Sequence, residues 1–577
     1  MFAPTTWRDR LLAVVALAAI AAFYTITAAG NLSETDDAFA FAYRVEHFPL
    51  THANDPRLIG YHALARGVWL LAQALAIDLR GLEILRAISV LGATACLWLV
   101  ARILMRNLRV APAPALLATL CLGGSYGFWR YAAEGDVYAP AMMCCAWILH
   151  CLLERDSGWR RGALLGACAG AAVLFYQPNV IPLFLVFPLL LLASGAPVLL
   201  AYGAAGAATA AAGYLAGFLV YWPEPLGVHA IATFMVQRSE EFLIPPLSLR
   251  TVAVSMIKSA LTLGHDIVSA NWVFGLPRAE PLVQRLFSGH VIAEELFLAR
   301  SAGALVYVPL AILPALAVAA WRVASAARPY LLATQSVRPM PLIWYWTLLV
   351  GAINGRLNPA GVEAWIVILL PLTLLIAVNI IAPAWERRSV AVCMLLALLV
   401  AHNMVGGMLL VRSPASDLTY VRGEWVIKNA KVGDLVIVSG NANLAEALRY
   451  RSRAQVLNVH PFDAAGLPLA LVAQDGPIFQ IVSQGRDFAG IDVVAVVRRI
   501  AADGGRVVVF DGFFTLPESA AAQTAAQQLK MASTLVHRDA AGGATWVLRP
   551  VWAQAPMRQD SRSDSSRPPA PGATGDR

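Results

Sequence analysis

Two acidic clusters in the sequence stand where long apolar runs end. Asp36 and Asp37 follow the first apolar run within "TDDAFAFAYR", and Glu134 and Asp136 lie in "YGFWRYAAEGDVYAP", between two later runs. A carboxylate at such a position can act as a general base that removes a proton from a hydroxyl nucleophile. The alternative is a solvated loop, because acids are tolerated wherever a chain leaves the bilayer.

A third turn, "NGRLNPAGVEAW" at 354–365, adds another acid and a base. If the nucleophile displaces a phosphate, cationic groups must hold the leaving group, and Arg, Lys or a divalent metal ion could serve. For each arginine, anchoring to a phospholipid headgroup is the alternative. No His, Cys or acid spacing indicates a metal site. The candidate substrate-binding residues are Arg44, Arg57, His62, Arg66, Arg130, Tyr138, Arg356 and Glu363.

The composition indicates a polytopic membrane protein that would hold these residues on helices. Of 577 residues, 58% are hydrophobic and 14% charged, whereas about a quarter charged is usual in soluble proteins. The formal charge of +8 resides largely in loop arginines and does not indicate nucleic-acid binding. Hydropathy predicts about eleven spans: 11–29, 84–105, 112–129, 138–153, 162–177, 180–195, 198–221, 301–321, 341–354, 362–383 and 389–411.

The charges of the connecting loops predict the orientation of these spans. Arginine-rich loops belong in the cytoplasm by the positive-inside rule, and here they are 106–109, 154–161, 322–340 and 386–388. The N-terminus is then cytoplasmic, and all three acidic clusters face outside. The long outer loops 30–83 and 222–300 contain amphipathic stretches that predict helices lying on the membrane surface.

The C-terminal part of the chain has a different pattern. Short β-branched runs at 434–440, 454–459, 477–483 and 506–512 alternate with helical patterns at 491–505 and 521–532. This alternation predicts a small extracytoplasmic α/β domain with a largely parallel sheet. No G-x-G-x-x-G or P-loop motif supports nucleotide binding. The predicted division is a transmembrane domain at 1–411, the α/β domain at 412–550 and a disordered Pro/Ser/Arg-rich tail at 551–577.

The acid pair after the first span, the amphipathic segment "GYHALARGVWLLAQAL" and the turn "LNPAGVEAWIVILLPL" resemble the GT-C class of integral-membrane glycosyltransferases. That class includes protein O-mannosyltransferases and lipid A aminoarabinose transferases. The resemblance implies inverting transfer from a lipid-phosphate sugar. It makes Asp36 the base, Asp37 a group that orients the acceptor or a metal, and Glu134 and Asp136 the second acidic position. The family more often has Asp-Glu where this chain has Asp-Asp, so the two roles are exchangeable.

The sequence therefore predicts a polyprenyl-phosphate-sugar-dependent glycosyltransferase in a bacterial cytoplasmic membrane, with a protein, lipid or glycan acceptor. A transporter or lipid-linked glycan flippase would place ionisable residues near the bilayer midplane, whereas the predicted span interiors are nearly uncharged. A catalytically inactive envelope scaffold is the third alternative. The glycosyltransferase hypothesis requires that Asp36 line one cavity with Glu134 or Asp136.

Overall fold

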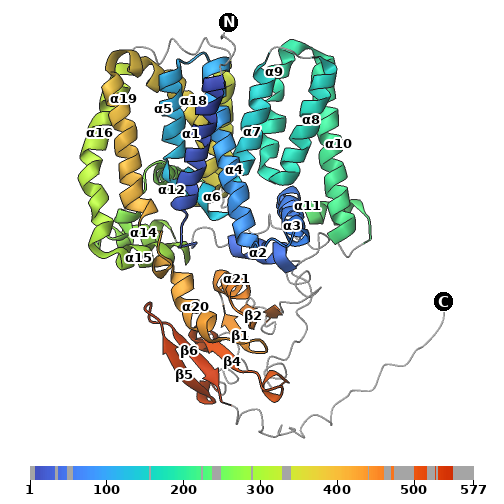
Figure 1. Ribbon diagram of the computed structural model, residues 1–577, viewed down its shortest axis with the longest axis vertical. Coiled ribbons are helices and arrows are strands. Elements are labelled where there is room, and N and C mark those ends of the chain that lie inside the picture. The colour runs from blue at the N-terminus through green and yellow to red at the C-terminus, as the bar shows by residue number, and fades with distance from the viewer. Residues whose placement is uncertain are drawn as a thin grey trace, which may run out of the picture.

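The chain is a helical bundle joined at one end to a small sheet (Figure 1). The computed structural model describes residues 7–32, 37–47, 56–154, 158–221, 225–236, 248–287, 290–327, 339–439, 441–460, 470–472, 499–515, 527 and 530–549. Asp36, the predicted strand 477–483, the predicted tail 551–577 and most of the predicted helices 491–505 and 521–532 lie outside these residues.

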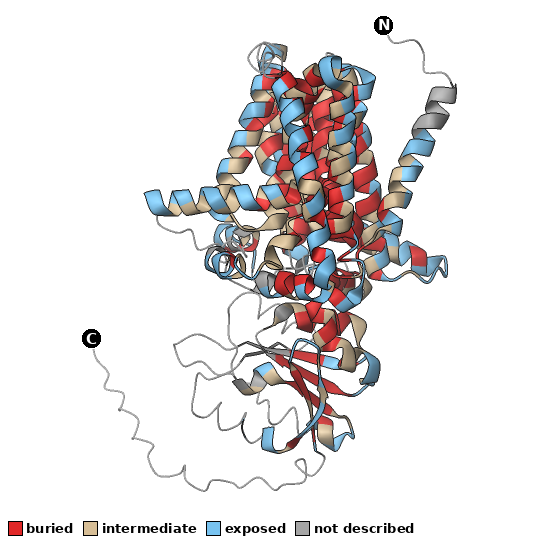
Figure 2. Ribbon diagram, turned by 90° about the vertical axis from the view of Figure 1, so that its left-hand side faces the viewer, coloured by how far each residue is buried: buried red, intermediate tan, exposed pale blue. Residues whose placement is uncertain are grey.

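Apolar helices run lengthwise through the bundle (Figure 1), and the first of them leans away from the others (Figure 2). They are α1 (Trp7–Ile26), α4 (Gly81–Arg102), α5 (Pro112–Gly123), α7 (Tyr138–Leu153), α8 (Trp159–Phe175), α10 (Ala196–Tyr221), α16 (Val308–Ala327), α17 (Met340–Leu357), α18 (Val362–Ile376) and α19 (Ala382–Asn403). A π-helix, Ile181–Val186, continues into the short α9 (Pro188–Leu191) and forms a further rod.

By length and composition, five helical stretches among the described residues could cross a membrane: Gly81–Asn107, Gln177–Ser194, Ala196–Val220, Ala293–Ala327 and Val362–Met408. The helix α6 (Tyr126–Glu134) and α7 meet at an angle of 109° and would together form a sixth. The longest stretch breaks at Arg388, where the backbone leaves helical geometry (φ −147°, ψ 55°). That break falls inside the predicted loop 386–388. The number of eleven spans stays a prediction.

Small residues allow helices of the bundle to approach closely. A Cβ atom on Gly166 of α8 would lie 2.0 Å from the carbonyl oxygen of Tyr202 in α10. The stretch 202–217, "YGAAGAATAAAGYLAG", supplies the matching small-residue face. Such contact between backbones is the usual means of helix packing inside a bilayer, where burial from water gives no driving force.

Further helices gather at the end of the bundle that faces the sheet (Figure 1). They are α2 (Asp37–His47), α3 (Ile59–Ala74), α6, α11 (Val228–Val236), α12 (Leu249–Ile267), α13 (Asn271–Phe274), α14 (Glu280–Leu286) and α15 (His290–Ala302). In α3, Tyr61 and Ala65 are buried, whereas Leu64, Val68 and Leu71 are exposed. This apolar exposed face is typical of a helix that lies at a membrane surface.

A six-stranded sheet with the order β3-β2-β1-β4-β6-β5 forms the far end of the chain. Its strands are β1 (Leu435–Ser439), β2 (Gln455–His460), β3 (Ala470–Val472), β4 (Val507–Phe510), β5 (Ser533–Arg538) and β6 (Ala544–Leu548). The helices α20 (Leu418–Asn429) and α21 (Ala442–Arg451) accompany it. Val426, Leu448 and Val436 share its hydrophobic core, and the buried strands and helix faces appear red in Figure 2.

The prediction of a largely parallel sheet is wrong in part. β1 pairs in parallel with β2 and β4, but the pairs β2–β3, β4–β6 and β5–β6 are antiparallel. β5 and β6 are joined by a tight turn in which Asp539 N–H donates to the Gly543 carbonyl oxygen at 3.0 Å. A turn this short can connect only antiparallel strands, so the described sheet is mixed.

Candidate active site

A sharp bend between α6 and α7 presents Asp136 at the end of the bundle that faces the sheet. Gly135 makes the bend with φ +98°, a left-handed conformation that favours glycine. A Cβ atom there would also lie 3.1 Å from the backbone nitrogen of Arg86. The Tyr61 hydroxyl donates to the Gly135 carbonyl oxygen at 3.1 Å, and the Ser89 hydroxyl donates to that of Asp136 at 2.5 Å. These hydrogen bonds to the backbone fix the position of Asp136.

Asp136 lies on the wall of a cavity of about 480 Å³. The cavity is enclosed by parts of α2, α7, α11, α17 and α18 and by the segment around 177–182, which are far apart in the sequence. Among the predicted site residues, those that line it are Asp37, Arg57, Asp136, Tyr138 and Glu363. The structure therefore brings three of the predicted acids and one predicted arginine together from four segments of the chain.

One part of the cavity wall is apolar. Met142 and Val180 line it together with Trp346, Val350 and Leu370 from α17 and α18. Such a wall can accommodate a hydrocarbon chain, whereas the acids and Arg57 can contact a polar headgroup. The cavity thus combines the two kinds of surface that an amphipathic ligand needs.

Side-chain amides contribute further polar groups that the sequence analysis did not select. Gln177, Asn179, Asn354 and Asn358 line the same cavity. Asn179 donates to the Ala172 carbonyl oxygen at 3.1 Å, and Gln177 donates to that of Met235 at 3.4 Å. For Gln177 and Asn179, the one indication in the sequence was that "FYQPNVIP" interrupts two apolar runs.

The charged groups of the cavity are predominantly acidic. Asp37, Glu363 and Glu134 lie near enough to Asp136 to interact with it electrostatically. Of the described residues that line the cavity, Arg57 is the one with a permanent positive charge. Asp37 is exposed and is the first residue of α2. Asp36, the predicted base, lies outside the described residues.

The other predicted acid of this region, Glu134, does not line the cavity. It forms an ion pair with Arg130 one helical turn earlier in α6, and both side chains are fully buried. Arg130 also donates to the carbonyl oxygen of Asn31 at 3.0 Å. The Arg130 guanidinium therefore links Glu134 of α6 to the segment that leads to α2.

The remaining predicted substrate-binding residues do not line the cavity. Arg44 is buried in α2 above the Phe41 ring, and the buried His62 ring meets the same phenylalanine edge-on at 4.9 Å. Arg66 donates to the carbonyl oxygens of Val45 and Glu46 near the end of α2. Arg356 lies in the last turn of α17. Arg44, His62 and Arg66 therefore lie in or beside α2 and do not line the cavity.

The described residues do not present a protein site for a metal ion. Within the described ranges, no group of three or more His, Cys, Asp or Glu side chains is arranged to hold one.

Comparison with solved structures identifies the fold. ArnT from Cupriavidus metallidurans bound to undecaprenyl phosphate is similar over 94% of this chain and 98% of its own, with 11% identity and a TM-score of 0.51. Its apo form gives 12% identity over 94% and 99%, with a TM-score of 0.42. An oligosaccharyltransferase from Archaeoglobus fulgidus, solved with Zn and sulfate, gives 14% identity over 77% and 62%, with a TM-score of 0.41.

The similarity to the undecaprenyl-phosphate-bound ArnT extends over almost the whole of both chains. The chain therefore has the fold of the GT-C membrane glycosyltransferases, which confirms at the level of fold the resemblance recognised in the sequence. No protein-family model and no curated protein matches the sequence.

Proposed function

We propose that this protein transfers a sugar from a polyprenyl-phosphate carrier to an acceptor outside the cytoplasm. The observation that carries the proposal is the convergence of Asp37, Asp136 and Arg57 on one cavity with an apolar wall. The fold adds support, because ArnT, which shares it, is solved with undecaprenyl phosphate bound. The apolar wall would receive the prenyl chain, and the polar wall would receive the phosphate and the sugar.

The proposed roles follow from the charges. Arg57 binds the phosphate, whose negative charge grows as the bond to the sugar breaks. One acid of the pair Asp36 and Asp37 removes the proton from the acceptor hydroxyl, and the resulting nucleophile attacks the anomeric carbon opposite the phosphate. Attack from that side inverts the configuration. Asp136 and Glu363 orient the hydroxyl groups of the sugar and the acceptor.

The orientation in the membrane is part of the proposal. The N-terminus and the sheet lie at opposite ends of the bundle (Figure 1), and the cavity-lining Asp37 and Asp136 lie at the end near the sheet. We place the N-terminus in the cytoplasm of a bacterium, the eleven predicted spans in its inner membrane and the sheet in the periplasm. The acceptor would then reach the cavity from the periplasmic side.

Sugar transfer from a polyprenyl-phosphate donor to native envelope acceptors, measured in vesicles that carry each variant, tests this function. We expect Asp37→Asn, Asp36→Asn and Asp136→Asn to reduce transfer, with the largest loss at the base, on the order of a hundredfold or more. Asp78→Asn is the matched control, because Asp78 is an exposed acid of the same outer loop and does not line the cavity. A parallel reaction with chelator tests metal dependence.

Two results would contradict the proposal. Undiminished transfer by all three variants, Asp36→Asn, Asp37→Asn and Asp136→Asn, would remove the assigned chemistry and favour a scaffold. Movement of the donor across the membrane with its sugar–phosphate bond intact would identify a transporter.

A further inference from the structure

The segment that carries Asp37 is attached to the outer part of the chain at its N-terminal end. Leu32 N–H donates to the Asp417 carboxylate at 3.0 Å. Beside it, the Asn31 side-chain amide donates to the Ser416 carbonyl oxygen at 2.9 Å. Asp417 also accepts a hydrogen bond from Tyr420 N–H at 2.9 Å and thereby caps α20. One buried carboxylate therefore joins the start of α20 to the residue where the acid-bearing segment begins.

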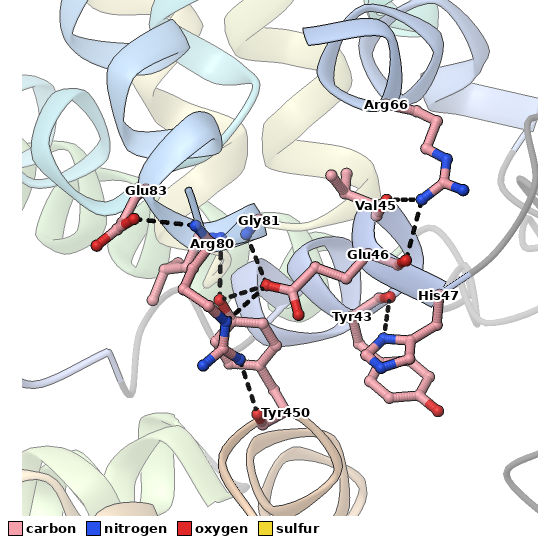
Figure 3. A network of polar contacts seen from close by, with 10 residues as sticks. Tyr43, Val45, Glu46, His47, Arg66, Arg80, Gly81, Glu83 and Tyr450 are labelled. Carbon is pink, nitrogen blue, oxygen red and sulfur yellow. Dashed lines mark hydrogen bonds and ion pairs between the residues drawn. The ribbon is translucent and has the colours of Figure 1, made fainter. Parts of the chain in front are cut away.

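The same segment is attached again at the C-terminal end of α2, through Glu46 (Figure 3). The Oε1 atom of Glu46 accepts hydrogen bonds from Gly81 N–H at 2.7 Å, from Arg80 Nε at 2.9 Å and from the Tyr450 hydroxyl at 3.1 Å. The Glu46 side chain is only 13% exposed, so these hydrogen bonds are largely shielded from competing water. Tyr450 belongs to α21, which packs against α2.

Tyr450 bridges α2 and the start of α4. Its hydroxyl donates to Glu46 and accepts from Leu82 N–H at 3.2 Å. Its ring lies 5.9 Å from the Phe39 ring and 4.6 Å from the Arg80 guanidinium. Burial raises the pKa of Tyr450 to about 12, so the hydroxyl keeps the proton that it donates across the physiological range.

A small hydrophobic core connects Tyr450 to the two parts of the chain that carry Asp37 and Asp136. Tyr450 packs in one cluster with Leu32, Phe39 and Phe41 of the acid-bearing segment. The same cluster contains Val137, the neighbour of Asp136. A movement of α21 would therefore be transmitted to α2 and to the bend that presents Asp136, because packed cores deform little.

We infer that the outer segment 417–451 positions Asp37 at the cavity, with Asp417 and Tyr450 as positioning residues at the two ends of the segment. The inference rests on the proposed transfer function. It gives the outer domain a role in catalysis that is separate from recognition of the acceptor: the domain fixes the acid-bearing segment, and the carboxylate itself contacts the substrates.

Two conservative variants of the full-length protein test the inference. Tyr450→Phe removes only the hydroxyl. Asp417→Asn keeps one oxygen acceptor, which cannot serve both Leu32 and Tyr420. Tyr420→Phe is the matched control, because the Tyr420 hydroxyl makes no hydrogen bond to the described part of α2. Thermal stability, hydrogen–deuterium exchange of residues 37–47 and transfer kinetics are measured for each variant in nanodiscs.

In both variants we expect the amide hydrogens of α2 to exchange faster than in the wild type. We also expect kcat to fall about tenfold, because small displacements of a reacting group slow catalysis strongly. KM for the polyprenyl-phosphate donor should change less than twofold, because Arg57 and the apolar wall are untouched. The control should match the wild type in exchange and in kcat. If Tyr450→Phe folds poorly, Glu46→Gln tests the same hydrogen bond from its other side.

Unchanged exchange in α2 for both variants would overturn the inference, as would faster exchange with an unchanged kcat. An effect on KM alone would overturn it too and would assign the outer domain to substrate binding. A wild-type protein that transfers no sugar would refute the proposed function instead. The exchange data would still show whether the contacts of Asp417 and Tyr450 hold α2 in place.

Discussion

Glu134 is paired with Arg130, whereas Asp136 lines the cavity. We therefore predict that Glu134 contributes to the stability of the fold and that Asp136 contributes to sugar transfer. The Arg130 and Glu134 side chains are both fully buried, and the pair lies within one turn of α6. Glu134→Gln keeps the shape of the side chain and removes the charge opposite a buried guanidinium. Removing one partner of a buried pair costs roughly 3–5 kcal/mol, because the other charge is left without compensation.

The assay is thermal or denaturant-induced unfolding in nanodiscs, with sugar transfer measured on the fraction that stays folded. We expect Glu134→Gln to lower the free energy of unfolding by about 3–5 kcal/mol and to retain transfer per folded molecule. Asp136→Asn should show the reverse: near wild-type stability and a large loss of transfer. The two acids are two residues apart, so the pair of variants is closely matched.

A double variant completes the experiment. Arg130→Met combined with Glu134→Leu removes both charges, and replacement of a whole buried pair by hydrophobic residues of similar volume is often neutral. The double variant should therefore recover most of the stability that Glu134→Gln loses. Wild-type stability of Glu134→Gln together with a loss of transfer equal to that of Asp136→Asn would refute this reasoning and make Glu134 a catalytic acid.

Three further predictions concern the bend, the phosphate and the sheet. Gly135→Ala should destabilise the protein by at least about 1–2 kcal/mol, the cost of a left-handed residue with a side chain, and unfolding measurements check this. Arg57→Gln should weaken binding of undecaprenyl phosphate by about 1.5–3 kcal/mol, the value of a hydrogen bond to a charged group, as measured by titration calorimetry; unchanged affinity would exclude Arg57 from the phosphate site. Burial favours a raised pKa for Asp434, but the hydrogen bonds from Arg506 and from the Lys431 backbone N–H, together with the Arg506 charge, outweigh it and lower the pKa. The stability that this carboxylate adds is therefore complete above its ordinary pKa of 3.8 and is lost as the pH falls through the lower folded-state pKa. Acidification should thus lower the protection of the β1 amides, measured relative to their intrinsic exchange rates at each pH, and Asp434→Asn should abolish that acid-dependent component.

Much of the candidate site could be predicted because membrane boundaries are readable in a sequence. Asp37, Asp136 and Glu363 each follow or precede an apolar run, and the loop charges indicate that they share one side. The structure brings these three acids to one cavity. Residues on one side of the membrane can meet only at that surface. Three short motifs that are far apart in the sequence could therefore be assigned to one site.

Other features depend on packing that no local pattern encodes. Glu134 and Asp136 are near neighbours in sequence, but the bend at Gly135 directs one to Arg130 and leaves the other on the cavity wall. The contact between Tyr450 and Glu46 joins residues 404 positions apart. Likewise, the antiparallel β5–β6 hairpin lies at 533–548, beyond the last predicted helix at 521–532, where the sequence analysis predicted no strand.

The proposed function requires that the polyprenyl-phosphate carrier bind in this cavity. A cryo-electron microscopy structure of the full chain in a nanodisc with undecaprenyl phosphate tests this most directly. We predict that the phosphate contacts Arg57, that the prenyl chain follows the wall formed by Trp346, Val350 and Leu370, and that Asp37 and Asp136 flank the phosphate. A well-defined carrier bound elsewhere, with this cavity free of lipid, would contradict the account.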